Sequence, residues 1–428
     1  MNIDYQYLRP KKAEWLQAMY GDPFNQKEPM EVWRGQNATI LPLREENRGS
    51  YRFGIGGVVD EHGDAVPLSA IPTRVGAGYA FENPEYRDEK VVYCGYLINH
   101  WGHFLVESVT RLWFALESQE DVDHYVFYLD EGEQREIKGN FREFLELMGI
   151  WEKCVFINRP TTYREVIVPK NAFLFLHYTS DQYRNIFDAI ASRIQIDPNW
   201  ETPKRLFFTR SSFAKGNNSD FGVEMLDSFF RNNGYAVLAP EKMTLAQLIH
   251  CVRNAEEIAT ISGTVHHNIL FGNKGQKITI MERLIVNIDY QVSINQLMDL
   301  DVTYVDANFN MCSVSMVGPF CVGYNHILER FQKDRNMVGP DAVFTTKKYR
   351  DQCFKAYMRS YQDNYRYRWH MDSFGPELHL ALYEAYMDNY EYFSEYLDGS
   401  RPFLKEHYFQ IHYWKQWVKR MLKKVRGA

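Results

Sequence analysis

The sequence predicts an α/β protein with two strand–helix units that face each other across a cleft, followed by a helical C-terminal extension. At 428 residues the chain is longer than a single core usually becomes. From residue 91 onward, strand-like and helix-like segments alternate, and a polar, proline-flanked stretch at 197–205 interrupts the alternation once. We therefore place the units at 1–196 and 203–310 and the extension at 311–428. One continuous α/β sheet remains the alternative.

The first unit begins with a different pattern from the rest. Residues 30–80 alternate short apolar runs with turn residues, which indicates a small antiparallel element. The remaining segments of this unit fit an alternating sheet and its covering helices. The expected strands are 91–97, 124–129, 155–158, 165–169 and 173–178, and the expected helices are 99–118, 141–150 and 182–196.

The second unit has the more regular alternation. The expected strands are 205–210, 235–240, 256–261 and 277–282, and the expected helices are 222–234, 244–255 and 264–272. This is a compact doubly wound unit of the size of one nucleotide-binding half. Two such units joined by a linker enclose a cleft, where a ligand-binding site is expected.

Composition narrows the class of protein. Charged residues make up 24% and hydrophobic residues 45%, as in soluble globular proteins, and the net charge of −6 argues against nucleic acid as a partner. The six cysteines, at positions 94, 154, 251, 312, 321 and 353, lack metal-ligand spacing and are expected to be reduced. We find no signal-like start, and the longest uncharged run, 307–328, is too polar to span a membrane. A cytoplasmic protein is expected.

The C-terminal end carries a different charge from the rest of the chain. Residues 401–428 contain eight Lys or Arg and one acidic residue, Glu406, so that their local charge is +7. Within this stretch, 408–428 reads as an amphipathic helix that places tryptophans on one side and lysines on the other. Such a helix fits the anionic inner face of a membrane. An ordinary packed terminal helix is the alternative.

The segment NHWGHFLVESVTRLW, 99–113, combines core residues with four groups that are costly to bury. In a regular helix, His100, His103, Glu107 and Arg111 fall within roughly an 80° arc. A metal site is one interpretation, although a third ligand at a known spacing is missing. A buried ion pair between Glu107 and Arg111 is a second. The third is an active-site face with a general base.

The segment ISGTVHHNILF, 261–271, reads as a strand that turns into a helix through glycine. Backbone N–H groups are free at such a helix start, and they suit a phosphate. The residues in question are Ser262, Gly263, Thr264, His267 and Asn268. Alternatively, Thr264 is only an N-cap.

Charged residues follow three other strands of the second unit. Arg210 and Lys215 lie at and after a strand end, where cations can pair with a pyrophosphate, although for Lys215 ordinary surface charge is the simpler interpretation. Glu241 and Glu282 also follow strands, the position of a ribose-binding acid in such units. Their common location at strand ends supports a function in binding a nucleotide.

These motifs together resemble glycosyltransferase family 61. The resemblance covers roughly residues 93–283 and rests on HFLVE followed by Arg111, on RLFFTR, on NNGYAVLAPEKMTLAQLI and on SGTVHHNILF. The family includes bacterial capsular polysaccharide enzymes, plant xylan transferases and eukaryotic O-linked N-acetylglucosaminyltransferases. The resemblance implies a GT-B fold, with an acceptor domain followed by a donor domain, and inverting transfer from a nucleotide sugar. The residues that match family positions are His103, Glu107, Arg111, Arg210, Glu241, Gly263, His267 and Asn268.

One departure concerns the segment before the helix at 222–234. The family usually has an Asn-Glu-x-Glu-like segment there, whereas this chain has NNSDFGVEM, in which Asp220 and Glu224 are the candidates for a donor contact. The extension beyond 310 lies outside the resemblance.

The sequence therefore predicts an inverting glycosyltransferase of bacterial capsule or other surface polysaccharide synthesis, at the cytoplasmic membrane face. The donor is a nucleotide sugar, with a UDP-sugar favoured, the acceptor is a glycan or lipid-linked glycan, and no metal or other cofactor is required. We expect Glu107, or in second place His103, as the base, with His100 and Arg111 orienting them. Arg210, the 262–264 backbone and His267 are expected to bind the diphosphate. A non-catalytic nucleotide- or glycan-binding subunit and a metal-dependent hydrolase using His100 and His103 remain alternatives.

Overall fold

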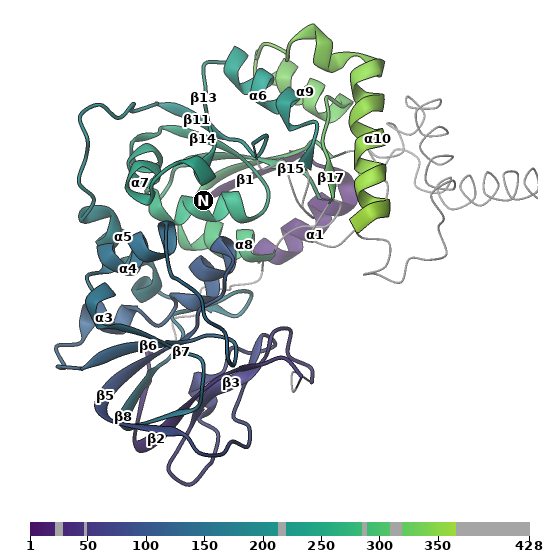
Figure 1. The fold of residues 1–428 in the computed structure, drawn as a ribbon. Coiled ribbons are helices and arrows are strands. Elements are labelled where there is room, and N and C mark those ends of the chain that lie inside the picture. Colours follow the sequence, from purple (N-terminus) through teal and green to yellow (C-terminus); the bar gives the residue numbers. More distant parts are fainter. Residues whose placement is uncertain (22–28, 47–48, 213–219, 285–288, 309–318, 365–428) are drawn as a thin grey trace, which may run out of the picture.

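The computed structural model describes residues 1–21, 29–46, 49–212, 220–284, 289–308 and 319–364. Two large sheets dominate these residues, one of seven strands and one of six, and helices cover both (Figure 1). The α/β prediction is confirmed, and apart from the N-terminal strand the two large sheets take their strands from different predicted units.

The seven-stranded sheet has the order β4-β3-β2-β8-β5-β6-β7. Strands β8, β5, β6 and β7 are parallel, whereas β2 is antiparallel to both β3 and β8. The antiparallel region predicted at 30–80 is thus an edge of the main sheet. The strands are β2 (Val32–Arg44), β3 (Gly54–Val59), β4 (Val75–Ala77), β5 (Glu85–Tyr96), β6 (His124–Tyr128), β7 (Cys154–Ile157) and β8 (Thr161–Pro169).

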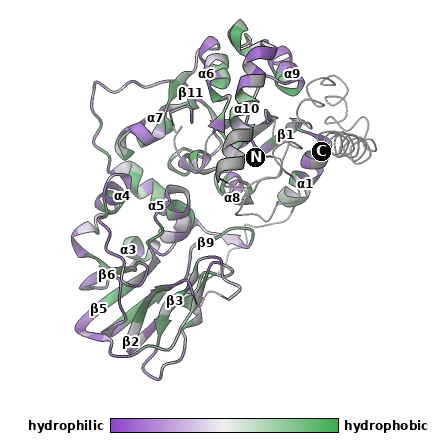
Figure 2. Cartoon of the chain, turned by 45° about the vertical axis from the view of Figure 1, so that its right-hand side comes forward, coloured by the Kyte–Doolittle hydropathy of each residue, from purple (hydrophilic) through white to green (hydrophobic). Residues whose placement is uncertain are grey.

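Two helices of the first unit cover this sheet on the side toward the second unit (Figure 1). They are α4 (Asn140–Met148) and α5 (Asp181–Ser192), and the short helices η1 (Pro67–Ser69) and η3 (Trp151–Lys153) lie in loops. Figure 2 shows both hydrophilic and hydrophobic residues on these helices, as expected where one side packs on a core. A small hairpin of β9 (Phe173–Leu174) and β10 (Tyr178–Thr179) replaces the single strand predicted at 173–178.

The six-stranded sheet is parallel throughout, with the order β1-β16-β15-β14-β11-β13. Such a sheet requires crossover connections, and helices supply them here. The strands are β1 (Asn2–Tyr7), β11 (Arg205–Phe208), β13 (Ala236–Leu238), β14 (Glu257–Ile261), β15 (Lys277–Glu282) and β16 (Asp301–Asp306). The helices are α6 (Val223–Asn232), α7 (Leu245–Asn254), η5 (Thr264–Phe271) and α8 (Asp289–Leu297).

The N-terminal residues belong to this second sheet. Strand β1 pairs with β16, almost 300 residues away, and α1 (Pro10–Gly21) follows it. Lys12 of α1 holds Glu282 at 2.9 Å, and both side chains are buried. The predicted first unit, 1–196, therefore differs from the structure in its first 21 residues, because a strand's partner cannot be inferred from its own short sequence.

The helix predicted at 99–118 is broken into three parts. A single turn, α2 (Trp101–His103), leads into a π-helical turn, η2 (Phe104–Ser108), and a bend separates this turn from α3 (Trp113–Glu117). The Val109 N–H accordingly donates to the Phe104 carbonyl, five residues back. A π-turn rotates the residues that follow it, so the predicted common arc ends after Glu107.

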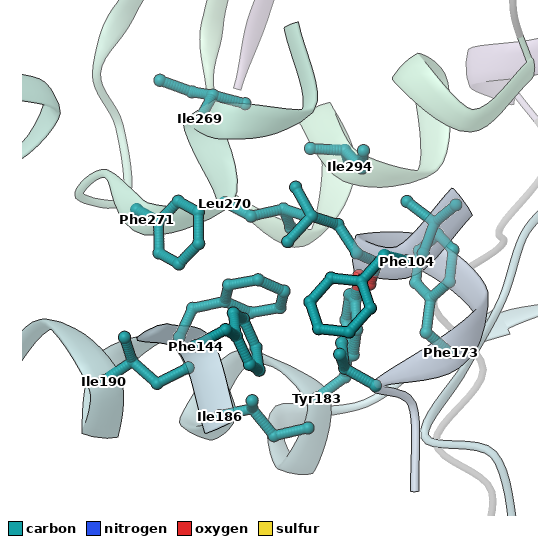
Figure 3. Close-up of a cluster of buried hydrophobic side chains, with 14 of the residues drawn as sticks. Phe104, Phe144, Phe173, Tyr183, Ile186, Ile190, Ile269, Leu270, Phe271 and Ile294 are labelled. Atoms are coloured by element: carbon teal, nitrogen blue, oxygen red, sulfur yellow. The ribbon is translucent and has the colours of Figure 1, made fainter. Parts of the chain in front are cut away.

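One hydrophobic cluster spans both units, and each unit also has a further cluster of its own. Figure 3 shows Phe104, Phe144 and Tyr183 of the first unit against Leu270, Phe271 and Ile294 of the second. The rings of Phe187 and Phe271 are 5.3 Å apart. Burying each such side chain stabilises the fold by roughly 1.5–3 kcal/mol, so this interface fixes the units to each other.

Polar contacts reinforce the same interface. The Glu143 carboxylate of α4 accepts hydrogen bonds from the backbone N–H groups of Leu245 and Ala246, both at 2.8 Å. These donors lie in the first turn of α7 and have no partner within the helix, so a residue of one unit caps a helix of the other.

The described part of the extension packs on the second unit. It comprises β17 (Phe320–Cys321), which pairs with β12 (Asp220–Phe221), and then α9 (His326–Asp334), η6 (Ala342–Thr345) and α10 (Lys347–Asn364). The predicted amphipathic segment 408–428 lies outside the described residues, as does Cys312. Within the ranges that the structure describes, we find no helix with both the length and the apolar content that a membrane crossing needs.

Candidate active site

A pocket of about 620 Å³ lies between the two units. Its first wall contains α2 and the start of α4, and its second wall contains residues that follow β11, β14 and β15. Parallel sheets commonly bind ligands at the carboxyl ends of their strands, and this volume is typical of small-molecule sites.

Most of the residues predicted from the sequence meet in this pocket, although they come from segments up to about 170 positions apart. The predicted residues that line it are His100, His103, Arg210, Glu241, Gly263, Thr264, His267 and Asn268. Glu107, Arg111, Ser262 and Glu282 are buried away from its surface. Lys215 lies outside the described residues.

The helices α2 and η5 touch at one end of the pocket. A Cβ on Gly102 would lie 2.9 Å from the Thr264 hydroxyl and 3.2 Å from the His267 ring, so the approach requires glycine. The Trp101 indole donates a 2.8 Å hydrogen bond to the Asn268 side chain. The cleft expected between the two units is therefore closed at this end.

His103 and Glu107 form a close pair whose members differ in exposure. The His103 Nδ1 is 2.8 Å from a Glu107 carboxylate oxygen across the π-turn. The Glu107 side chain is 3% exposed, whereas His103 is 18% exposed and lines the pocket. Glu107 therefore lies behind the histidine, and His103 is the member of the pair that lines the pocket.

Two residues not predicted from the sequence hold the other oxygen of Glu107. The Tyr290 hydroxyl donates to it at 2.5 Å, and the Arg74 Nε lies 3.1 Å from it. Burial raises the pKa of the Glu107 carboxyl, but His103, Tyr290 and Arg74 outweigh that effect, and the pKa lies below its ordinary value. Glu107 is therefore a buried, ionised carboxylate.

Arg111 occupies a different place from the predicted one. Its guanidinium donates to the carbonyls of Pro169, Leu68 and Ala70 at 2.9–3.1 Å and lies over the Tyr93 ring. It is fully buried, and these hydrogen bonds anchor residues 68–70 and the end of β8. The proposed ion pair with Glu107 and the orienting role are wrong, because the π-turn and the bend direct Arg111 away from the pocket.

The other two pocket histidines are neutral. His100 is exposed at the pocket surface, but partial desolvation by its surroundings lowers its pKa to about 4, and the charges of His103 and Arg210 add to this effect. Burial also lowers the pKa of His267 well below its ordinary value. His267 can therefore offer a ligand a hydrogen bond but no positive charge.

Two arginines form the opposite wall of the pocket. Arg210 Nε donates to Asp220 at 2.8 Å, and Arg283 pairs with the other oxygen of the same carboxylate. Asp220, a predicted donor contact, is thus the counter-ion of both arginines. Burial lowers the pKa of Arg283 to about 10, so it stays protonated at neutral pH.

Gly263 allows this arrangement. Its φ of +120° and the approach of Arg283, whose Nη2 would be 2.5 Å from a Cβ, both exclude other residues. Arg283 also donates to the Ser262 carbonyl at 2.7 Å, while the Ser262 hydroxyl accepts the Arg283 backbone N–H. Ser262 therefore positions Arg283 and does not line the pocket. Arg283 directly follows the predicted Glu282, and its position at a strand end was the signal that could have identified it.

The other three predicted acids of this unit lie in different surroundings. Glu241, in η4 (Pro240–Lys242), is exposed on the pocket wall and remains available for a ribose. Glu282 is buried against Lys12. Successive side chains at the end of β15 point to opposite faces, so Glu282 points away from the pocket that its neighbour Arg283 lines. Glu224 accepts from Tyr349 of α10 at 3.2 Å, outside the pocket. The ribose role of Glu282 is therefore wrong.

Within the described ranges we find no group of three or more His, Cys, Asp or Glu side chains placed to hold a metal ion. His100 and His103 in particular have their ring centroids 4.9 Å apart and the Glu107 carboxylate on one side only.

Residues 101–279 match the family model of glycosyltransferase 61. This region belongs to glycosyltransferase family 61. The match begins at α2 and ends within β15, and it includes His103, Glu107, Arg210 and Gly263. The family 61 region covers less than half of the chain, yet it contributes to both walls of the pocket. A search of curated proteins finds no match. Membership in the family supports glycosyl transfer as the general reaction.

Proposed function

We propose that the protein is an inverting glycosyltransferase with a GT-B arrangement, which moves a sugar from a nucleotide-sugar donor to a hydroxyl of a glycan or lipid-linked glycan. A UDP-sugar is the favoured donor. One observation carries this proposal: a pocket-facing imidazole with a buried carboxylate behind it lies in the same pocket as two arginines.

His103 is the proposed general base. Its Nδ1 faces Glu107, which leaves Nε2 to accept the proton of the acceptor hydroxyl as that oxygen attacks the anomeric carbon. The buried carboxylate stabilises the imidazolium that forms, as in other acid–histidine pairs. Attack opposite the leaving group inverts the anomeric configuration.

The arginine wall is the proposed site of the leaving nucleoside diphosphate. As the bond from the anomeric carbon to the diphosphate oxygen breaks, negative charge develops on that oxygen. Arg210 and Arg283 supply permanent positive charge, and the N–H groups at the start of η5 face the same region. With these cations in place, we propose that no metal ion is required.

The cellular role is proposed from the sequence. The resemblance to capsular polysaccharide enzymes favours surface glycan synthesis in a bacterium, and the basic segment 408–428 favours the inner face of the membrane. Deleting residues 414–428 should release the protein from anionic liposomes, and unchanged binding would contradict the membrane role.

The donor proposal is tested by thermal shift with UDP-, GDP- and CMP-sugars, followed by assay of nucleotide release in EDTA. We expect a UDP-sugar to raise the Tm and to be turned over slowly without metal. Binding without turnover, even with a range of glycan acceptors, would favour the non-catalytic subunit. Turnover that EDTA abolishes would contradict the metal-independent mechanism.

A further inference from the structure

Tyr290 belongs to the second unit, but its hydroxyl lies in the polar cluster of the first. It donates to Glu107 at 2.5 Å and accepts from the Arg74 guanidinium at 2.7 Å. The residue is 5% exposed and its ring stacks on Phe175 with centroids 4.1 Å apart. The proposed mechanism assigns no role to this contact between the units.

The same ring forms part of the pocket wall beside both histidines. Its centroid is 6.0 Å from that of His267 and 6.3 Å from that of His103. Tyr290 stands in the first turn of α8, the helix that follows β15 and the donor-side Arg283. It therefore connects the proposed donor site with the proposed base.

We propose that Tyr290, supported by Arg74, is a positioning residue that fixes Glu107 against His103 and thereby ties the base on one unit to the donor-binding unit. The proposal rests on the role of His103 proposed above. It differs from a purely structural role, because it requires Tyr290 to act on the protonation of the His103 ring through Glu107.

The geometry explains why the hydroxyl matters. One oxygen of Glu107 contacts His103, and the other is held by Tyr290 and Arg74, so the carboxylate cannot rotate freely. By donating a hydrogen bond, the phenol hydroxyl also stabilises part of the negative charge of Glu107, which would otherwise act on the imidazole alone. Without the hydroxyl, more of that charge favours the protonated form of His103, and protonation should persist to higher pH.

Several charged or titratable groups surround this cluster, and each would influence the readout. Those that face His103 or Glu107 are His100, Arg52, Arg74, Arg210, His267 and Tyr290. Tyr290→Phe removes only the hydroxyl of Tyr290 and leaves the side chains of the other five residues in place.

The test follows the ring signals of the full-length protein by NMR across a pH titration. Among the 13 histidines, the His103 signal is identified by its loss in His103→Asn. In Tyr290→Phe we expect protonation of His103 to extend about 0.5 pH unit or more upward. Arg74→Gln should act in the same direction. In a Glu107→Gln background, Tyr290→Phe should have no effect.

Tyr304→Phe is the matched control. The Tyr304 hydroxyl is also buried, and its partners are Tyr20 and Asn295 at 2.7 and 3.0 Å, away from Glu107. It should alter stability and leave the His103 titration unchanged. An unchanged titration in both Tyr290→Phe and Arg74→Gln would overturn the proposal, as would an equal shift in Tyr304→Phe.

UDP binding measured on the same samples separates a failure of the proposed function from a failure of the positioning role of Tyr290. If Tyr290→Phe shows the shift but the wild-type protein binds no UDP or UDP-sugar, the proposed function is contradicted and the positioning role stands. UDP binding with no shift would contradict the positioning role alone.

Discussion

A buried carboxylate supports each wall of the pocket, but it has a different effect in each. Each contains a carboxylate that is buried at 3% side-chain exposure and held by groups that face the ligand space, Glu107 on one wall and Asp220 on the other. Behind the histidine wall, Glu107 supports an imidazole that can gain and lose a proton. On the arginine wall, Asp220 holds two guanidiniums that remain charged.

The difference shows how partner chemistry decides what a buried acid does. A carboxylate beside a titratable ring tunes proton transfer, whereas a carboxylate between two permanent cations sets their spacing and limits their net charge. The histidine wall should therefore control the rate of transfer and the arginine wall the binding of the diphosphate. Each prediction below separates these two effects.

The largest effect is expected at the histidine wall. His103→Asn removes the proton acceptor and should lower transfer by roughly 10²–10⁴-fold. Glu107→Gln keeps the shape of the side chain but removes its charge, and it should also abolish most transfer. Both variants should bind UDP within about threefold of the wild type by calorimetry, because the recorded ion pairs of His103 and Glu107 do not include Arg210 or Arg283. Lost donor binding would remove these residues from the base role.

The next effect is expected at the arginine wall. Arg283→Met should weaken UDP binding by at least about 30-fold, because truncating one partner of a buried charge pair costs about 2–5 kcal/mol. The NMR titration of His103 should stay as in the wild type. Arg205→Met is the control, since it removes an arginine with a comparable ion pair to Glu257, 2.9 Å apart on the surface. Equal loss of UDP binding in both variants would indicate general destabilisation instead.

Much of this site could be predicted from the sequence because its parts are local motifs. The glycine turn at Gly263 and Arg210 at a strand end are recognisable from neighbouring residues alone. Arg283 also stands at a strand end, although the prediction named its neighbour, Glu282. The period of a strand, two residues, decides which of these neighbours reaches the pocket, and a shift of one residue changes the answer.

What could not be predicted depends on contacts distant in sequence. Nothing around Arg74 or Tyr290 indicates that they meet at Glu107, since 216 positions separate them. The π-turn at 104–108 gives no periodicity signal, and together with the bend that follows it separates Arg111 from His103. The pairing of β1 with β16 is equally invisible, because a six-residue strand does not encode its partner.

The smallest effect concerns stability. The buried ring of His266, behind the pocket, donates a hydrogen bond from Nε2 to the side-chain oxygen of Asn295 at 2.8 Å, and burial lowers its pKa to about 4 from an ordinary 6.5. Between these values the unfolded chain binds a proton that the folded chain does not bind. Stability contributed by the neutral ring is therefore present above pH 6.5 and is lost as the pH falls toward 4.

His266→Gln should flatten this acid dependence. One histidine contributes a slope of up to about 1.4 kcal/mol per pH unit over that window, and the variant should lose it. Urea unfolding at pH 4.5, 5.5, 6.5 and 7.5 measures the slope directly. His62→Gln, which replaces a ring that is 76% exposed, should keep the wild-type slope. An unchanged slope in His266→Gln would mean that the acid sensitivity lies elsewhere.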